Sequence, residues 1–144
     1  MTIDTSKIAI LNFDVTRFLV FKDGKPTDLT IDDLQKIETI LNECITIYNS
    51  EQEKRFNEIK AQNPVYKLEK ENFIIDLQHY KRQYEPVLNS KGEKEVWVNC
   101  FCDTHNSDWR NERVVVKDGG NCYFNLKINL TKGHYYELKV NRDA

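Results

Sequence analysis

Three side chains that commonly bind metals stand close together near residue 100. Cys100 and Cys102 are separated by one residue, His105 follows three residues later, and Cys122 lies on what we expect to be a nearby strand. Thiolates and imidazoles are ligands that hold zinc tetrahedrally, so zinc binding is one interpretation. The simpler interpretation is free thiols, because Cys100 and Cys102 share a strand face with apolar residues that should form the core. We expect no cofactor.

His79 and His134 are the remaining candidates for proton transfer, since histidine titrates near neutral pH. Asp76 precedes His79 by three residues and would point to the opposite face of a strand, so it could not orient the imidazole. His134 falls in an expected hairpin turn. The Asp-Gly-Gly-Asn sequence at 118–121 lacks the spacing of a phosphate-binding loop. These residues predict no catalytic site and favour a protein that is not an enzyme.

Aromatic and amide side chains alternate with apolar ones on two expected strands, so they should face away from the core. They are Trp97, Asn99, Phe101, Tyr123 and Asn125. Aromatic rings among amides are typical of recognition surfaces, because they combine contact area with adaptable hydrogen bonding. The alternative is that the same side chains are covered, by the first strands, by residues 63–71 or by a second copy of the chain.

Composition limits the classes of partner. The 144 residues include 21 basic and 23 acidic side chains, for a formal net charge of -2, and 40% of them are hydrophobic. Such a chain can bury a core of its own, so we expect one domain over residues 1–144. Balanced charge gives no broad positive field for nucleic acid, and no apolar run approaches the roughly 20 residues that cross a bilayer. No export signal is visible, so a complete chain would be cytoplasmic.

One long helix is predicted in the first half of the chain. Thr30 is a typical N-cap, and acidic residues follow it in the first turn. Apolar residues then recur at spacings of three and four as far as Ile59. The helix should end before Asn63, because Pro64 disfavours helical geometry in the residue before it. A break near residues 49–50 is an alternative to one continuous helix.

Strands are predicted on both sides of this helix, where apolar residues recur with a period of two. One or two strands are expected within residues 7–21. A meander is expected after the helix, with strands at 73–84, 95–102, 109–117, 122–130 and 136–140. Turn-forming residues separate most of these strands, at 89–92, 118–120 and 131–133.

This pattern indicates an α+β domain in which one long amphipathic helix packs on an antiparallel β-meander sheet. The order of early strand, long helix and meander resembles the cystatin-like arrangement, with the nuclear-transport-factor-like folds as a neighbour. The resemblance is topological and covers most of the chain, and the tail from residue 97 also resembles small bacterial proteins of an uncharacterised family. The inhibitory motifs of cystatins are absent, because residues 84–92 contain no Gln-x-Val-x-Gly and no proline precedes Trp109. The resemblance therefore implies a fold and no protease inhibition.

Together, these features favour a non-enzymatic protein-binding domain, of inhibitor or immunity type, that uses the outer sheet face and the adjoining hairpins. The alternative is a small-molecule binder or enzyme of the nuclear-transport-factor-like kind. Its pocket would lie between helix and sheet, where His79 or Tyr80 could line it. A homodimer is compatible with either interpretation.

Overall fold

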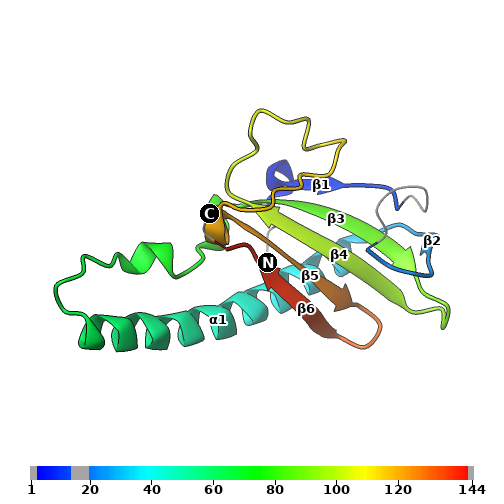
Figure 1. Ribbon diagram of the computed structural model, residues 1–144. Coiled ribbons are helices and arrows are strands. Elements are labelled where there is room, and N and C mark those ends of the chain that lie inside the picture. Colours follow the sequence, from blue (N-terminus) through cyan, green and yellow to red (C-terminus); the bar gives the residue numbers. More distant parts are fainter. Residues whose placement is uncertain (1–2, 14–19, 143–144) are drawn as a thin grey trace.

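The computed structural model describes residues 3–13 and 20–142. One long helix, α1 (Ile31–Gln62), lies on a six-stranded, mostly antiparallel open sheet, as Figure 1 shows. The strands are β1 (Ile8–Ile10), β2 (Lys25–Pro26), β3 (Lys81–Leu88), β4 (Lys94–Phe101), β5 (Tyr123–Asn129) and β6 (His134–Val140). This arrangement confirms the predicted α+β architecture.

The helix α1 begins after Thr30 and ends before Asn63, as the sequence predicted. The Thr30 hydroxyl accepts a hydrogen bond from the Asp33 backbone N–H at 3.1 Å, and the Asp33 carboxylate accepts one from the Thr30 N–H at 2.9 Å. This reciprocal pair satisfies two backbone donors at the start of the helix. The helix is continuous through Asn49, whose side chain instead bonds both main-chain groups of Ile75 at 2.8 Å. No helix of the described residues is long and apolar enough to cross a membrane.

The carboxyl-terminal half of α1 extends past the end of the sheet, and the chain then runs back beside it towards β3 (Figure 1). The returning segment is held on the helix by Phe73, whose ring meets that of Phe56 edge to face at 5.3 Å between centroids. Lys70 of the same segment pairs with Glu53 at 2.8 Å.

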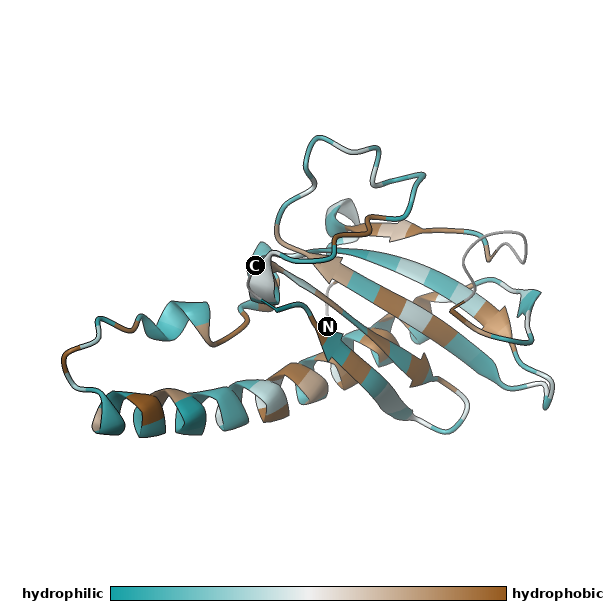
Figure 2. Ribbon diagram, in the orientation of Figure 1, coloured by the Kyte–Doolittle hydropathy of each residue, from teal (hydrophilic) through white to brown (hydrophobic). Residues whose placement is uncertain are grey.

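The strands are ordered β1-β3-β4-β5-β6, with β1 parallel to β3 and β2 paired antiparallel to β3 on the same side. Hydrophobic and hydrophilic residues alternate along β4, β5 and β6 (Figure 2), so each strand has one apolar face. The apolar face packs on α1, where Ile37 and Leu41 meet Val98 and Leu126 in the main core. Each such side chain contributes about 1.5–3 kcal/mol by burial.

One predicted strand begins later than expected, and another is absent. Residues 73–80 contain a short 3₁₀ turn at Leu77–His79, because the Asp76 carboxylate accepts a hydrogen bond from the Gln78 N–H and closes the chain locally. The strand predicted there begins only at Lys81. Residues 109–117 are a loop, and residues 118–120 therefore form no hairpin between strands. Within residues 7–21, the described part contains the single strand β1, and residues 14–19 lie outside the described residues.

Candidate functional site

The face of the sheet turned away from α1, called here the outer face, carries side chains in rows that the strand register fixes. Two neighbouring rows cross the four strands from β3 to β6. The polar row consists of Gln83, Asn99, Asn125 and Lys139. The mixed row consists of Glu85, Trp97, Lys127 and Tyr136. The predicted recognition residues therefore belong to a wider set that includes both neighbouring strands.

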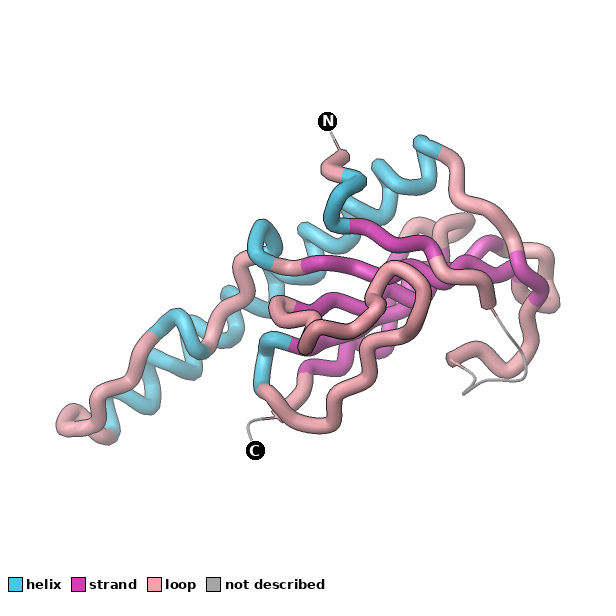
Figure 3. Tube along the Cα trace, turned by 90° about the horizontal axis from the view of Figure 1, so that it is seen from above, coloured by secondary structure: helices cyan, strands magenta, loops and turns pink. Residues whose placement is uncertain are grey.

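The loop of residues 102–122 lies over one part of this face, on the side of the sheet opposite α1 (Figure 3). Side-chain amides bind its main chain. The side-chain carbonyl of Gln83 accepts a hydrogen bond from the Val114 main-chain N–H at 3.0 Å. The side-chain amide of Asn99 donates one to the Val114 main-chain carbonyl at 2.8 Å. The Gln83 amide also donates to two further carbonyls of the loop at 2.6 Å each. The side chains of Gln83 and Asn99 thus supply hydrogen bonds that a neighbouring strand would supply to the main chain of a strand. The loop therefore needs no partner strand.

Charged and polar contacts hold the same loop along its length. Arg113 pairs with Glu85 through both carboxylate oxygens, one of them at 2.7 Å from the guanidinium. Glu85 is 2% exposed, so this pairing offsets the cost of burying its charge. The guanidinium also lies 5.3 Å from the centre of the Trp97 ring. Near the end of the loop, the Asn141 amide donates to the Val116 carbonyl at 2.6 Å.

A disulfide between Cys102 and Cys122 closes the base of the loop, with the two Cα atoms 5.0 Å apart. The prediction of free thiols is wrong for these two residues, because β4 ends at Phe101 and Cys102 no longer follows the alternation of the strand. Cys44 and Cys100 are free and buried in the core. Burial raises the pKa of Cys44 to about 11 and that of Cys100 to about 12, which keeps both thiols protonated and unreactive.

The zinc interpretation lacks its ligands. Cys102 is consumed by the disulfide, and no group of three or more His, Cys, Asp or Glu side chains in residues 3–13 and 20–142 could hold a metal ion. His105 instead contacts Tyr123: their rings stack at 5.8 Å between centroids, and the Tyr123 hydroxyl hydrogen-bonds His105 Nε2. His105 and Asn106 both have positive φ angles, of 51° and 56°, in the turn that places this ring.

The other histidines lie in open surroundings. His79 Nε2 is 3.4 Å from the Asp76 carboxylate, contrary to the prediction that the two side chains point apart. The reason is the 3₁₀ turn, which brings residues three apart to one side, whereas a strand would separate them. Both side chains are more than half exposed, so they line no closed site. Tyr80 packs in the core, and its hydroxyl donates to the Asn121 carbonyl at 2.7 Å.

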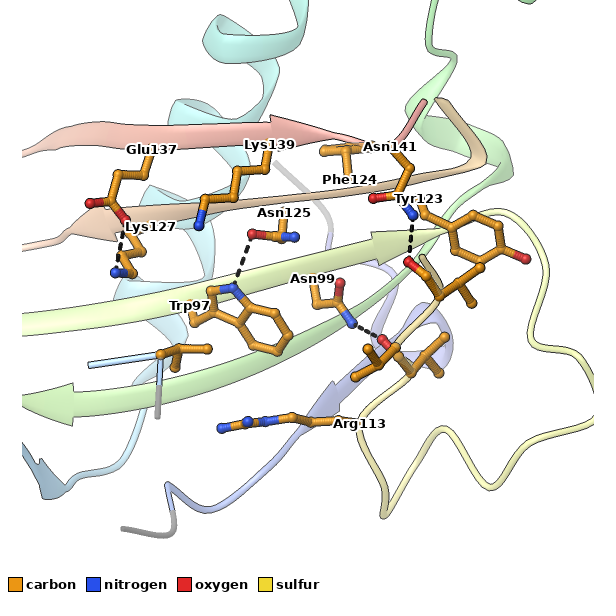
Figure 4. Close-up of a pocket in the computed structure, with 14 residues that line it drawn as sticks. Trp97, Asn99, Arg113, Tyr123, Phe124, Asn125, Lys127, Glu137, Lys139 and Asn141 are labelled. Carbon is orange, nitrogen blue, oxygen red and sulfur yellow. Dashed lines mark hydrogen bonds and ion pairs between the residues drawn. The ribbon is translucent and has the colours of Figure 1, made fainter. Parts of the chain in front are cut away.

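A cavity of about 350 Å³ remains on the outer face beside the loop (Figure 4). Trp97 and Asn125 form its floor, and the indole N–H donates to the Asn125 carbonyl oxygen at 3.3 Å. Residues 114–116 of the loop form one wall, and Val20 contributes from the amino-terminal segment. Its volume is at the lower end of the range for ligand pockets.

Three cationic side chains line this cavity: Arg113, Lys127 and Lys139. Arg113 is paired with Glu85, and Lys127 lies 2.9 Å from the Glu137 carboxylate. The pKa of Glu137 is below its usual range, mainly because Lys127 hydrogen-bonds it and with a smaller contribution from the charge of Lys139. Lys139 is exposed and forms no hydrogen bond or ion pair with any described residue. It is therefore the cation of this cavity with no carboxylate within ion-pair distance in the described chain.

All five predicted recognition residues face outward, and four of them line the cavity, namely Trp97, Asn99, Tyr123 and Asn125. The fifth, Phe101, is 1% exposed beneath Trp109 and Val114 of the loop. Part of the outer face is covered, by the loop and, at Trp97, by Phe13 and Phe21. Sequence reasoning missed Gln83, Arg113 and Lys139. The signal for Lys139 was its position between the apolar residues Leu138 and Val140, whereas nothing local marked Gln83 or Arg113.

The predicted alternative site, between helix and sheet, is occupied by side chains over most of its area, because the main core fills the space under β3, β4 and β5. Two hollows remain at its margins. One of about 210 Å³ is lined by the ion-paired Glu38 and Arg82, and the other is lined by Arg55 and Arg142 beyond the end of the sheet.

No protein-family model, curated protein or solved structure matches the chain. The function must therefore be inferred from the geometry of the outer face.

Proposed function

We propose that the protein is a non-enzymatic protein-binding domain, and that the outer-face cavity receives an extended segment of its partner. The observation that carries this proposal is the way the outer face binds its own loop. Gln83 and Asn99 hold both main-chain groups of Val114 through side-chain amides. The same polar row continues into the cavity with Asn125 and Lys139, where no described segment lies over it.

The chemistry of the cavity supports a peptide as the ligand. Val115 in the wall is 78% exposed and can contact an apolar side chain, whereas Trp97 is 7% exposed and closes the floor. The Asn125 amide nitrogen has no acceptor among the described residues and can donate to a main-chain carbonyl, as Asn99 does beside it. An extended segment would thus meet apolar and hydrogen-bonding groups alternately.

Peptide selection tests this proposal. A random peptide library is displayed on phage and selected against the immobilised protein, and enriched peptides are synthesised and their affinities measured by calorimetry. We expect enrichment, and we expect Val115→Glu to weaken the selected peptides at least about tenfold, because it places a charge in the apolar wall. Ile47→Glu is the matched control, since Ile47 is 52% exposed on α1 and lines no cavity. Peptides that bind Val115→Glu as well as the native chain, or no enrichment at all, would refute the proposal.

A small organic ligand is the second candidate, because the cavity volume falls within the range of ligand pockets. A fragment screen by thermal shift separates the two candidates. Fragments that stabilise the native chain but not Val115→Glu, together with a failed peptide selection, would establish the small-molecule function in place of peptide binding.

A further inference from the structure

We infer that the ligand of the outer-face cavity presents a carboxylate to Lys139 and Asn125, next to an apolar side chain that lies against Val115. This inference rests on the proposed function and specifies the chemistry of the partner's segment. The ligand we commit to is a peptide segment with an acidic residue beside an apolar one.

In the described chain, the cavity is lined by one more cation than there are carboxylates paired with these cations. Its cations are Arg113, Lys127 and Lys139, and the first two have carboxylate partners within the chain, Glu85 and Glu137. Lys139 has none among the described residues and is exposed at the rim. The chain as a whole has a net charge of -2, so this local excess of positive charge is not a general property of the surface. A ligand with one negative charge would give the third cation of the cavity, Lys139, a partner as well.

Asn125 lies where its side chain can bind the same ligand group as Lys139. Asn125 and Lys139 are directly opposite each other on β5 and β6, and Figure 4 shows both side chains on the same face. The Cβ atoms of such cross-strand partners are about 5 Å apart, so both side chains can reach one ligand group. The Asn125 carbonyl oxygen is used by the Trp97 indole, which orients the amide and leaves its nitrogen as the donor. An ammonium group and an amide N–H beside it are both donors, and a carboxylate has two oxygens that accept.

The surroundings favour a carboxylate over a phosphate. Besides lysine, phosphate sites in proteins commonly use guanidinium forks or the backbone N–H groups of a helix N-terminus. The guanidinium of this cavity already binds Glu85 through both carboxylate oxygens, and the cavity is built on strands and a loop. The exposed side chain of Val115, which lines the same cavity as these donors, favours an apolar group on the ligand close to its charge.

A matched pair of small probes tests the inference directly. The ¹⁵N-labelled protein is titrated with N-acetyl-leucine or with N-acetyl-leucinamide, which keeps the apolar side chain but has no charge. The readouts are the Asn125 side-chain amide and the Trp97 indole N–H signals. We expect N-acetyl-leucine to shift both signals saturably, and the amide to need a concentration about tenfold higher, because charge-assisted hydrogen bonds are the stronger ones.

Variants connect this preference to Lys139. In Lys139→Gln the two probes should become equal, whereas the control Lys54→Gln, on the exposed side of α1, should keep the preference. Equal shifts from the two probes on the native chain would overturn the inference, as would acid probes that move neither signal. The peptide selection separates the two proposals. Enriched peptides that depend on Val115 but contain no acidic residue would refute carboxylate recognition and leave peptide binding in place.

Discussion

The disulfide at the base of the outer-face loop should be a major source of stability. We predict that replacing Cys102 and Cys122 together by serine lowers the free energy of unfolding by about 3 kcal/mol. The two residues are 20 positions apart, and the entropy of closing a loop of that length in the unfolded chain corresponds to about this value. The native contacts of the loop with Gln83 and Glu85 do not involve sulfur, so the folded state should change little.

The predicted loss can be measured in two ways. An unfolding entropy of about 2.1 cal/mol/K per residue gives roughly 300 cal/mol/K for the 144 residues, so the melting temperature should fall by about 10 °C. In urea, the double variant should unfold with a larger m-value, because its unfolded chain is more expanded. The native chain in reductant should behave as the double variant does. A loss below about 1 kcal/mol, or a difference between the two proteins that persists in reductant, would refute the reasoning.

Two further predictions concern the loop and the helix N-terminus. Gln83→Leu should destabilise the protein by about 2–3 kcal/mol in urea unfolding, because it leaves buried main-chain groups of the loop unpaired, whereas the exposed Gln78→Leu should change stability little. A loss for Gln83→Leu no larger than that control would contradict the role given to Gln83. Burial alone would raise the pKa of Asp33, but the Lys94 ammonium and the Thr30 N–H outweigh it and hold that pKa below its usual range. A lowered pKa means that this carboxylate stabilises the fold above about pH 4 and ceases to do so as the pH falls further. Asp33→Asn should therefore be about 1 kcal/mol less stable at pH 7, with a gap that narrows in acid; a gap independent of pH would contradict the assignment.

The helix and the last strands were predictable because their signals are local. Thr30 and Pro64 mark the ends of α1 through contacts within a few residues, and the alternation from Phe124 to Ile128 reflects a strand with one buried face. Residues 73–80 and 109–117 were included in predicted strands but form none. In the first of these segments, the Asp76 carboxylate closes a turn. In the second, the hydrogen-bonding partners are Gln83 and Asn99, which are distant in sequence.

The sequence indicated several side chains of the candidate site, but it did not indicate the loop and the ion pairs that shape the cavity. The alternation within each of the two strands assigned Asn99 and Asn125 to the outward face. Lys139 belongs to the same row, but its role depends on which other cations have carboxylates nearby, and the residues of those pairs, Arg113 with Glu85 and Lys127 with Glu137, come from segments far apart in sequence. Likewise, Phe101 was expected on an open surface, and it is buried because a loop without any strand or helix signal folds across it.

The polar row itself favours binding over a purely structural role. Asparagine is disfavoured in strands, and burying an amide costs stability unless its hydrogen bonds are satisfied. A loop that only had to be held in place could rest on apolar residues, as Val114 does on Phe101. Gln83 and Asn99 are satisfied by the loop, which accounts for the first half of the row. The second half, Asn125 and Lys139, has donors that no described residue accepts, which is the arrangement that the proposed ligand requires.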